Sequence, residues 1–221
     1  MKIAAVICEF NPFHNGHKYL LDEIRSQGFD SIICVMSGSF TQRGEVAVLD
    51  KFQRAKVALK NGADLIIELP VPYAVASAQI FAKGSARIIK ATGVTDAVFF
   101  GSECGEIELL KKAAFATKDE KVAEVLKEKM NLGDYYPLAL EKAVNEVFGN
   151  EISEILANPN NTLGVEYIKE LDTSGIETAT IKRIAVDHDS TDSNGNFASA
   201  SLIREKIFKG EDVSKFVPEG D

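Results

Sequence analysis

Two of the three histidines in this 221-residue chain, His14 and His17, lie on either side of Gly16. The apolar run 3–8 and a turn containing Pro12 precede them, and a helical pattern follows. Such a turn directs backbone N–H groups and the positive end of a helix toward one point, where an anion can bind. Histidines three residues apart at a helix start can face that same point. We therefore predict a phosphate site here, at which Gly16 leaves room for the ligand.

Two other interpretations of the histidine pair stay open. Both side chains could be ordinary polar residues at the start of a surface helix. A zinc pair is a further option, but zinc needs three or four ligands and the third histidine, His188, has no cysteine near it in the sequence. The context favours phosphate, because strand, proline turn, H-x-G-H and helix occur together.

The elements that must position this turn follow from hydrophobic periodicity. Short apolar runs predict buried strands at 3–8, 31–36, 64–69 and 96–101. Helical patterns lie between and after them, at 17–26, 50–61 and 73–93. This alternation predicts a doubly wound α/β fold with a parallel sheet. Ligands bind at the carboxyl ends of the strands in such sheets, so the turns after these strands are expected to share one rim.

The second half of the chain has a different character. Residues from about 104 to 157 are helical and charge-rich, which predicts a helical insertion rather than a separate domain. A strand-like run at 177–186 follows, and the segment SASLIREKIF then predicts a closing helix. Between them, the loop DHDSTDSNGNF is expected to be mobile.

Composition limits the classes of protein that fit. The net charge of −8 argues against nucleic-acid binding by bulk electrostatics, although it leaves room for a local basic groove. Cys8, Cys34 and Cys104 are far apart and odd in number, which predicts reduced thiols rather than disulfides or a zinc knuckle. The first apolar run is too short for a signal peptide or a membrane span, so we expect a cytoplasmic protein without a membrane partner.

The chain resembles a known family over most of its length. The H-x-G-H stretch is similar to the signature of the nucleotidyltransferase superfamily. The following segments, in this order, resemble the bacterial tRNA(Met) cytidine acetate ligases: EFNPFHNGHKYLL, VMSGSFTQRGEVAVLDKFQRAKVALKNGADLIIELP, FFGSE, NNTLGVEYIKEL, IKRI and FASASLIREKI. The long second block is more specific than H-x-G-H alone.

This resemblance implies a Rossmann-like nucleotidyltransferase fold. An ATP-binding domain would span 1–210, with the helical insertion at about 104–157 inside it. Proteins of this family are substantially longer than 221 residues. We therefore expect 211–221 to begin a C-terminal region that is missing here and would carry much of the tRNA contact surface.

The resemblance also implies a reaction. Acetate would attack the α-phosphate of ATP to give acetyl-adenylate and pyrophosphate, and the acetyl group would pass to the wobble cytidine of elongator tRNA(Met). ATP is then a co-substrate, accompanied by Mg²⁺, and acetate and the tRNA are the partners. Acetate is already an anion, so the first step needs alignment and neutralised phosphates rather than a general base.

The resemblance assigns roles to individual positions. Catalysis is implied for His14, His17 and Arg204, and no protein side chain is expected to bind metal. Contacts with ATP are implied for every residue of the stretch 7–20: Ile7, Cys8, Glu9, Phe10, Asn11, Pro12, Phe13, His14, Asn15, Gly16, His17, Lys18, Tyr19 and Leu20. They are also implied for six later residues: Gly101, Asn161, Arg183, Ser199, Ser201 and Arg204.

The late serines and arginine also make chemical sense by themselves. Ser199 and Ser201 lie at the start of the last predicted helix, where hydroxyl and N–H groups can meet phosphate oxygens, and Arg204 lies one turn later. The serines could equally be helix caps and Arg204 a solvated surface residue. Ordinary roles as a turn glycine, a helix cap and a strand-end arginine also stay open for Gly101, Asn161 and Arg183.

The block SGSFTQRG predicts a flexible rim loop between Gly38 and Gly44. We expect Ser39, Gln42 and Arg43 in this loop to face the acetate or the cytidine, with a structural salt bridge as the alternative for Arg43.

The helix predicted at 50–61 follows this loop. Its apolar face is expected to hold Phe52, Ala55 and Leu59. The remaining cationic positions could face RNA or simply be solvated: Lys51, Arg54, Lys56 and Lys60.

Three other functions remain possible from the sequence. The chain could adenylate a small metabolite such as a pantetheine-like or pantoate-like acid, without any RNA. It could also be a nucleotide-binding regulatory module without turnover. A Ca²⁺ loop in DSTDSNGNF is the third, although the segment lacks the terminal Glu of an EF-hand.

Overall fold

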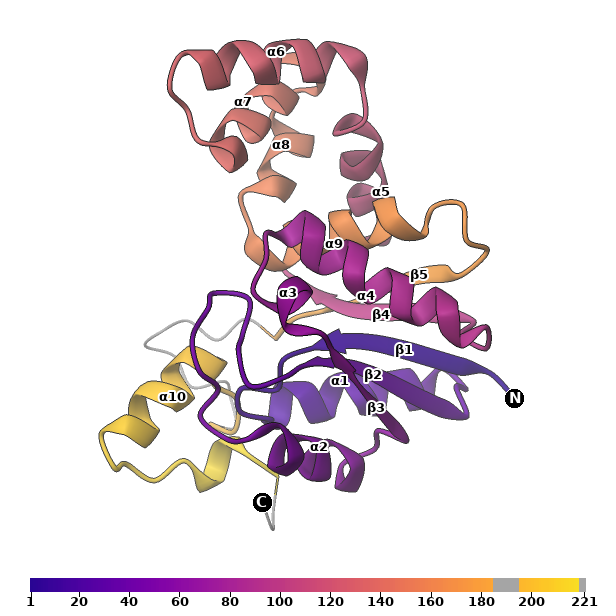
Figure 1. Ribbon diagram of the computed structural model, residues 1–221, viewed down its shortest axis with the longest axis vertical. Coiled ribbons are helices and arrows are strands. Elements are labelled where there is room, and N and C mark those ends of the chain that lie inside the picture. The colour runs from indigo at the N-terminus through magenta and orange to yellow at the C-terminus, as the bar shows by residue number, and fades with distance from the viewer. Residues whose placement is uncertain (185–194, 219–221) are drawn as a thin grey trace.

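The computed structural model describes residues 1–184 and 195–218 (Figure 1). The described residues form one sheet of five parallel strands in the order β3-β2-β1-β4-β5. The strands are β1 (Ile3–Cys8), β2 (Ser31–Ser37), β3 (Leu65–Leu69), β4 (Ala97–Ser102) and β5 (Glu177–Lys182). The strand order runs outward in both directions from β1, so the doubly wound α/β prediction is confirmed.

Helices cover both faces of this sheet. The first strand alternates its side chains between two hydrophobic clusters, with Val6 in one and Ile7 in the other. The Val6 cluster includes residues of α1 (Asn15–Ser26) and α2 (Lys51–Lys60), and the Ile7 cluster includes residues of α4 (Ala78–Thr92) and α9 (Pro159–Leu171). α1 and α2 therefore lie on one face, and α4 and α9 on the other.

The expectation of a buried strand at 64–69 is wrong for β3. This strand forms one edge of the sheet, and both Leu65 and Glu68 are exposed. An edge strand has a neighbour on one side only, so part of its surface faces solvent. Glu68 uses this exposure to pair with Lys51, at 2.7 Å.

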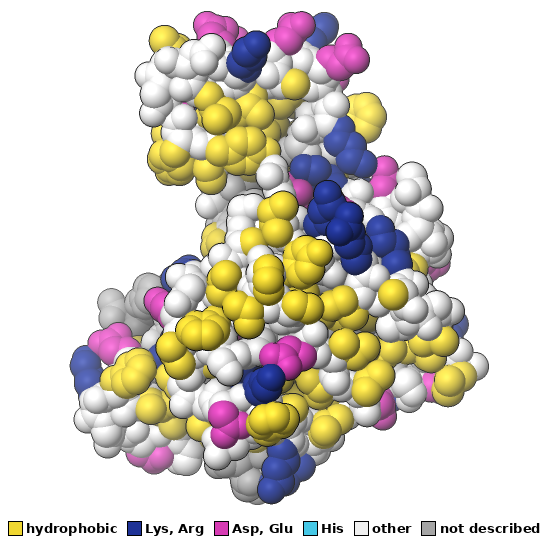
Figure 2. Space-filling model, viewed as in Figure 1, with side chains coloured by type: hydrophobic (Ala, Val, Ile, Leu, Met, Phe, Trp, Pro, Cys, Tyr) yellow, Lys and Arg dark blue, Asp and Glu magenta, His cyan; other side chains and the backbone are white. Residues whose placement is uncertain are grey.

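The predicted apolar face of α2 is also wrong. Phe52 is 76% exposed and Leu59 46% exposed, whereas Arg54 and Ala58 are fully buried. Arg54 can be buried because backbone carbonyl groups accept its hydrogen bonds, as described below. Exposed hydrophobic side chains are common on this molecule, as the face in view in Figure 2 shows. A basic face on α2 can therefore include only its exposed lysines and not Arg54.

The helix predicted at 73–93 is two helices. α3 (Val71–Ala74) carries Pro72 in its first turn, and α4 begins after its N-cap residue Ser77. Serine is a preferred N-cap type, which favours a restart of the helix at this point. α4 ends at Gly93, with φ of 66°, as the sequence predicts.

Between β4 and α9 the chain forms a helical segment, at the top of Figure 1. It consists of α5 (Ile107–Ala116), α6 (Glu120–Asn131), α7 (Tyr136–Phe148) and α8 (Asn150–Leu156). Leu110, Val122 and Leu140 continue the hydrophobic cluster of the α4 and α9 face into this segment. The described helices include none with the length and apolar character that a membrane crossing requires.

The last described elements of the chain lie beside the first turn. α10 (Ala200–Phe208) and a short 3₁₀ helix (Ser214–Phe216) form a small cluster in which Ile203 and Phe216 are buried. Most of the loop expected to be mobile, most of the Ca²⁺ alternative and His188 fall in 185–194, outside the described residues.

Candidate functional site

A cavity of about 580 Å³ lies at the carboxyl ends of β1, β4 and β5. Its walls come from the turn after β1, the loop after β2, the turns after β4 and β5, and parts of α1, α4, α9 and α10. This is the rim at which the topology of a doubly wound sheet predicts a ligand.

His14 and His17 form a capping box at the start of α1. His14 is the N-cap, and its Nδ1 accepts a hydrogen bond from the backbone N–H of Gly16 at 3.0 Å. His17 Nδ1 accepts from the backbone N–H of His14 at 3.3 Å, and the two rings stack with centroids 3.8 Å apart. Because both Nδ1 atoms accept, each neutral ring carries its proton on Nε2. Both residues line the cavity.

Burial keeps these imidazoles neutral. It lowers the pKa of His14 to about 4, with a smaller contribution from the charge of Arg183. Burial also lowers the pKa of His17 well below its ordinary value, assisted by His14 and Arg183. The pair therefore offers neutral N–H donors at pH 7, and positive charge must come from arginines and helix ends.

Aromatic rings and a glycine hold the histidines in place. Phe10 and Phe13 pack beside His17, with centroid distances of 4.9 and 5.7 Å. Phe10 has a φ of 49°, the left-handed region that non-glycine residues rarely adopt. A Cβ on Gly16 would lie 2.9 Å from Cε1 of His14. Residue 16 is therefore a glycine because the His14 ring occupies the space that a side chain would need. This reason is additional to the one predicted from the sequence, which was room for the ligand.

Four residues of the first turn and α1 do not line the cavity: Pro12, Phe13, Asn15 and Lys18. Helical periodicity turns Lys18 away, where it pairs with Asp22. Asn15 instead donates to the carbonyls of Asn196 at 2.7 Å and Lys215 at 3.0 Å. The other predicted residues of this stretch all line the cavity: Ile7, Cys8, Glu9, Phe10, Asn11, His14, Gly16, His17, Tyr19 and Leu20.

α10 presents a second helix N-terminus to the cavity. Ser199 is its N-cap, and the Ser199 hydroxyl accepts from the backbone N–H of Leu202 at 3.2 Å. Arg204 donates to the carbonyl of Asn11 at 3.0 Å and to Ser201 Oγ at 3.3 Å. Ser199, Ser201 and Arg204 all line the cavity. The Ser199 cap therefore exists, and its presence is compatible with the remaining N–H groups binding an anion.

Glu9 and the rim loop form another wall. Glu9 Oε1 accepts from the backbone N–H of Gln42 at 2.6 Å. Burial raises the pKa of the Glu9 carboxyl, although the Gln42 hydrogen bond and nearby arginines oppose this. Gln42 and Arg43 line the cavity, whereas Ser39 is exposed outside it and accepts from Ala47 N–H through its carbonyl.

Gly101 and Arg183 meet where β4 and β5 end. A Cβ on Gly101 would lie 3.2 Å from Arg183 Cγ, so the glycine makes room for the arginine stem. Both residues line the cavity.

Asn161 has a different position from the one predicted. It is 1% exposed, does not line the cavity and lies inside α9, whose N-cap is Asn158. Asn161 Oδ1 accepts from the backbone N–H groups of Glu103 at 2.9 Å and Cys104 at 3.2 Å. Its neighbour Asn160 lines the cavity instead. Asn161 thus fixes the turn after β4 against α9.

Sequence reasoning missed the structural role of Arg54. Its guanidinium donates to four backbone carbonyls at the ends of β1 and β2 and in the following loop: Glu9, Ser37, Gly38 and Leu49. No pattern in the sequence distinguishes this arginine from the lysines around it on α2. The sequence analysis also missed most of an apolar floor of the cavity, whose residues look like ordinary core positions: Phe81, Phe100, Leu163 and Tyr167. Ile7, which was predicted, belongs to the same floor.

The chain is similar to known proteins over nearly all of its length. A tRNA(Met) cytidine acetate ligase of Acetivibrio thermocellus is 42% identical over 221 residues, which cover 97% of this chain and 53% of that protein. A crystal structure of Thermotoga maritima TmcAL bound with alpha-thio ATP matches with a TM-score of 0.91 at 39% identity, covering 99% of this chain and 54% of that chain. The chain therefore spans about half the length of these relatives.

A more distant structure supports the fold alone. The bifunctional NMN adenylyltransferase/ADP ribose pyrophosphatase of Francisella tularensis matches with a TM-score of 0.50 at 12% identity, covering 100% of this chain and 45% of that chain. The family model of the HIGH nucleotidyl transferases matches residues 1–221. With its H-x-G-H turn at the cavity of a doubly wound sheet, this chain belongs to the HIGH nucleotidyl transferase family.

Proposed function

We propose that this chain binds ATP and activates acetate as acetyl-adenylate, for transfer to the wobble cytidine of elongator tRNA(Met). The relatives at about 40% identity that carry the name tRNA(Met) cytidine acetate ligase support the reaction. The Thermotoga maritima relative bound with alpha-thio ATP supports the nucleotide. A tRNA substrate implies reaction in the cytoplasm, as expected from the sequence.

One observation carries the proposal. The N-termini of α1 and α10 open into the same cavity, together with two imidazoles and the side chains of Arg183 and Arg204. Helix N-termini and arginines are the groups that proteins use to bind phosphates. A triphosphate between the two helices would meet cations and N–H donors from both sides.

The histidines then stabilise charge rather than transfer protons. As acetate attacks, the α-phosphate oxygens gain charge, and preorganised donors aimed at those oxygens lower the barrier. His14 and His17 supply Nε2–H donors whose rings are already fixed by the capping box. Arg204 neutralises the departing pyrophosphate while its bond to the Asn11 carbonyl keeps it beside the first turn.

The remaining predicted residues serve this geometry. We assign the other cavity-lining residues of the first turn, Gly101 and Arg183 to the nucleotide. Asn161 acts through the Glu103 turn that it holds. Gln42 and Arg43 face the acid or the acceptor cytidine from the rim loop, and Ser39 lies at the outer edge of this loop.

The donor set fits Mg²⁺ held mainly by ATP. Among the described residues no group of three or more histidine, cysteine, aspartate or glutamate side chains could hold a metal ion. Three carboxylates line the cavity, those of Glu9, Glu45 and Glu103, and Mg²⁺ often combines one or two carboxylates with substrate phosphates. When bound, the ion would neutralise phosphate charge.

Exchange of labelled pyrophosphate into ATP tests this function. We expect acetate-dependent exchange in the unaltered chain and at least a 100-fold loss in His14→Asn. Asparagine is a good N-cap, so this variant keeps the start of α1 while removing the Nε2–H donor. Lys56→Ala, on the exposed side of α2, should exchange normally.

Two results would contradict the proposal. ATP binding without exchange for any acid indicates a nucleotide-binding module, and exchange only with a larger metabolite acid indicates a different ligase. Transfer to tRNA is measured separately, by mass spectrometry of elongator tRNA(Met) after incubation with the chain, acetate and ATP.

A further inference from the structure

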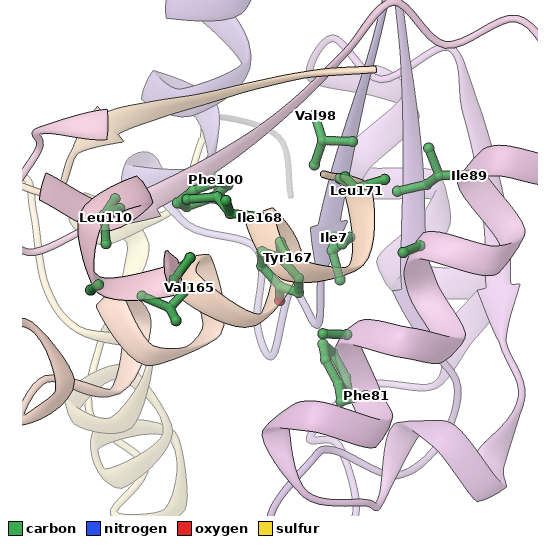
Figure 3. Close-up of a cluster of buried hydrophobic side chains, with 14 of the residues drawn as sticks. Ile7, Phe81, Ile89, Val98, Phe100, Leu110, Val165, Tyr167, Ile168 and Leu171 are labelled. Carbon is green, nitrogen blue, oxygen red and sulfur yellow. The ribbon is translucent and has the colours of Figure 1, made fainter. Parts of the chain in front are cut away.

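The cavity has an apolar floor on the side of the sheet that α4 and α9 cover. Ile7 of β1, Phe81 of α4, Phe100 of β4 and Tyr167 of α9 line it and belong to one hydrophobic cluster. Figure 3 shows Tyr167 reaching from α9 to the side of Ile7, near Phe81. The floor therefore continues the core of the protein up to the ligand space.

Tyr167 places a polar atom in this apolar surrounding. The residue is only 4% exposed and lines the cavity. Among the described residues no hydrogen bond is made by its hydroxyl, and this oxygen is not fully enclosed, since Ser37 Oγ is the one completely buried side-chain polar atom there that lacks a partner. Burial raises the pKa of Tyr167, as do the nearby Glu9 and Cys8, so the group stays protonated and can donate. An unpartnered donor that is open to a cavity can bind a ligand acceptor.

The shape of the floor is fixed by packing. The Phe100 and Tyr167 rings meet edge to face with centroids 5.6 Å apart. A Cβ on Gly164 would lie 2.4 Å from Phe100 Cε2, so the Phe100 ring rests directly on the backbone of α9. These contacts leave Phe100 and Tyr167 little freedom to fill the cavity or to withdraw from it.

The chemistry of this floor suits a short aliphatic acid. One donor and several hydrocarbon surfaces match a ligand with a carboxylate at one end and an alkyl group at the other. An adenine ring placed here would leave several ring nitrogens without partners, which costs binding energy. The groups suited to phosphates lie on other walls, at α1, α10 and Arg183.

We propose that this floor is the acyl subsite, in which Tyr167 donates to the carboxylate of the acid and Phe81 limits the length of its alkyl chain. The inference rests on the proposed function and specifies where its acid binds. The carboxylate would then lie between the Tyr167 hydroxyl and the α-phosphate held by the histidines. The alkyl group would contact Ile7 and Phe81.

Pyrophosphate exchange with acetate, propionate and butyrate tests this subsite in two variants. Tyr167→Phe removes only the hydroxyl, and we expect the KM for acetate to rise at least tenfold while the KM for ATP is unchanged. Phe81→Val enlarges the floor and should shift kcat/KM toward propionate or butyrate at least tenfold relative to acetate. The matched controls are Tyr135→Phe, at the exposed N-cap of α7, and Phe115→Val, at an exposed position on α5.

The outcomes separate the subsite from the proposed function. Exchange that remains acetate-dependent in both variants, with unchanged KM and acid preference, overturns the subsite alone. A rise in the KM for ATP in Tyr167→Phe, without a rise for acetate, also overturns it and assigns the floor to the nucleoside. No exchange by the unaltered chain with any of the three acids overturns the proposed function, and the subsite with it.

Discussion

Two helices point their N-termini into the cavity, and they are held there in different ways. α1 rests on the core of the sheet through Leu21 and Ile24, both fully buried. α10 buries Ile203 in a small cluster with Ala198 and Phe216. Polar bonds to the first turn, such as the one from Arg204 to Asn11, connect α10 to the rest of the site. One half of the phosphate site is thus built into the core, and the other half is attached to it.

This difference has consequences for stability. Segments with few buried apolar contacts open locally at lower free energy than segments in the main core. We expect α10 to open without unfolding the sheet, and ligand binding to hold it closed. α1 should open only when the whole domain unfolds.

Arg54→Met should have the largest effect, because it removes the support beneath the first turn. Four carbonyls, including those of Glu9 and Ser37, would lose their buried charged donor. We expect a loss of about 3 kcal/mol or more in the free energy of unfolding. Urea unfolding measures it, with Lys56→Met on the same helix as a control that changes stability by about 0.5 kcal/mol or less. Equal stability of the two variants would show that Arg54 does not support the site.

Truncations in the two helices sharpen the comparison. Leu21→Ala should lower the global free energy of unfolding by about 2–5 kcal/mol, the usual range for a buried leucine. Ile203→Ala should lower it by less than about 1 kcal/mol, because α10 can detach first. Its effect should appear instead as faster hydrogen exchange confined to α10. Similar global losses in both variants would mean that α10 belongs to the main cooperative unit.

The histidines of α1 predict a dependence of stability on pH. Between pH 6.5 and about 4 the unfolded chain protonates at His14 while the folded chain does not. The unfolded state then binds more protons, so the folded state loses stability as the pH falls. From pH 7 to pH 5 His14 alone should contribute a loss of roughly 2 kcal/mol.

Comparison with His14→Asn isolates this contribution. The raised pKa of Glu9 acts in the opposite direction, but it is common to both proteins and cancels in the difference. Urea unfolding at pH 7, 6 and 5 should therefore show a shallower pH dependence in the variant. Parallel curves would contradict a buried neutral His14.

The sequence predicted the parts of the site that depend on local chemistry. The histidine turn, a helix that begins beside it and, as one of two alternatives, a cap at Ser199 follow from residue types within a few positions. The doubly wound parallel sheet also follows from the alternation of strands and helices. These features need no knowledge of distant contacts.

The parts that the sequence did not predict depend on contacts between distant segments. Arg54 is buried because carbonyls of two strands and a loop converge on it, which no helical pattern reveals. Asn161 faces the turn after β4 rather than the cavity, because the register of α9 is set by packing. Tyr167 looks like a core residue until the cavity beside it is known.

Hydrogen exchange with and without ATP tests most directly whether both helices hold one nucleotide. We expect ATP to slow amide exchange in 15–26 and in 200–208, with the larger effect in α10 because it is held more weakly in the free protein. Exchange in α6, remote from the cavity, should not change. Protection of α1 without any protection of α10 would contradict the shared phosphate site.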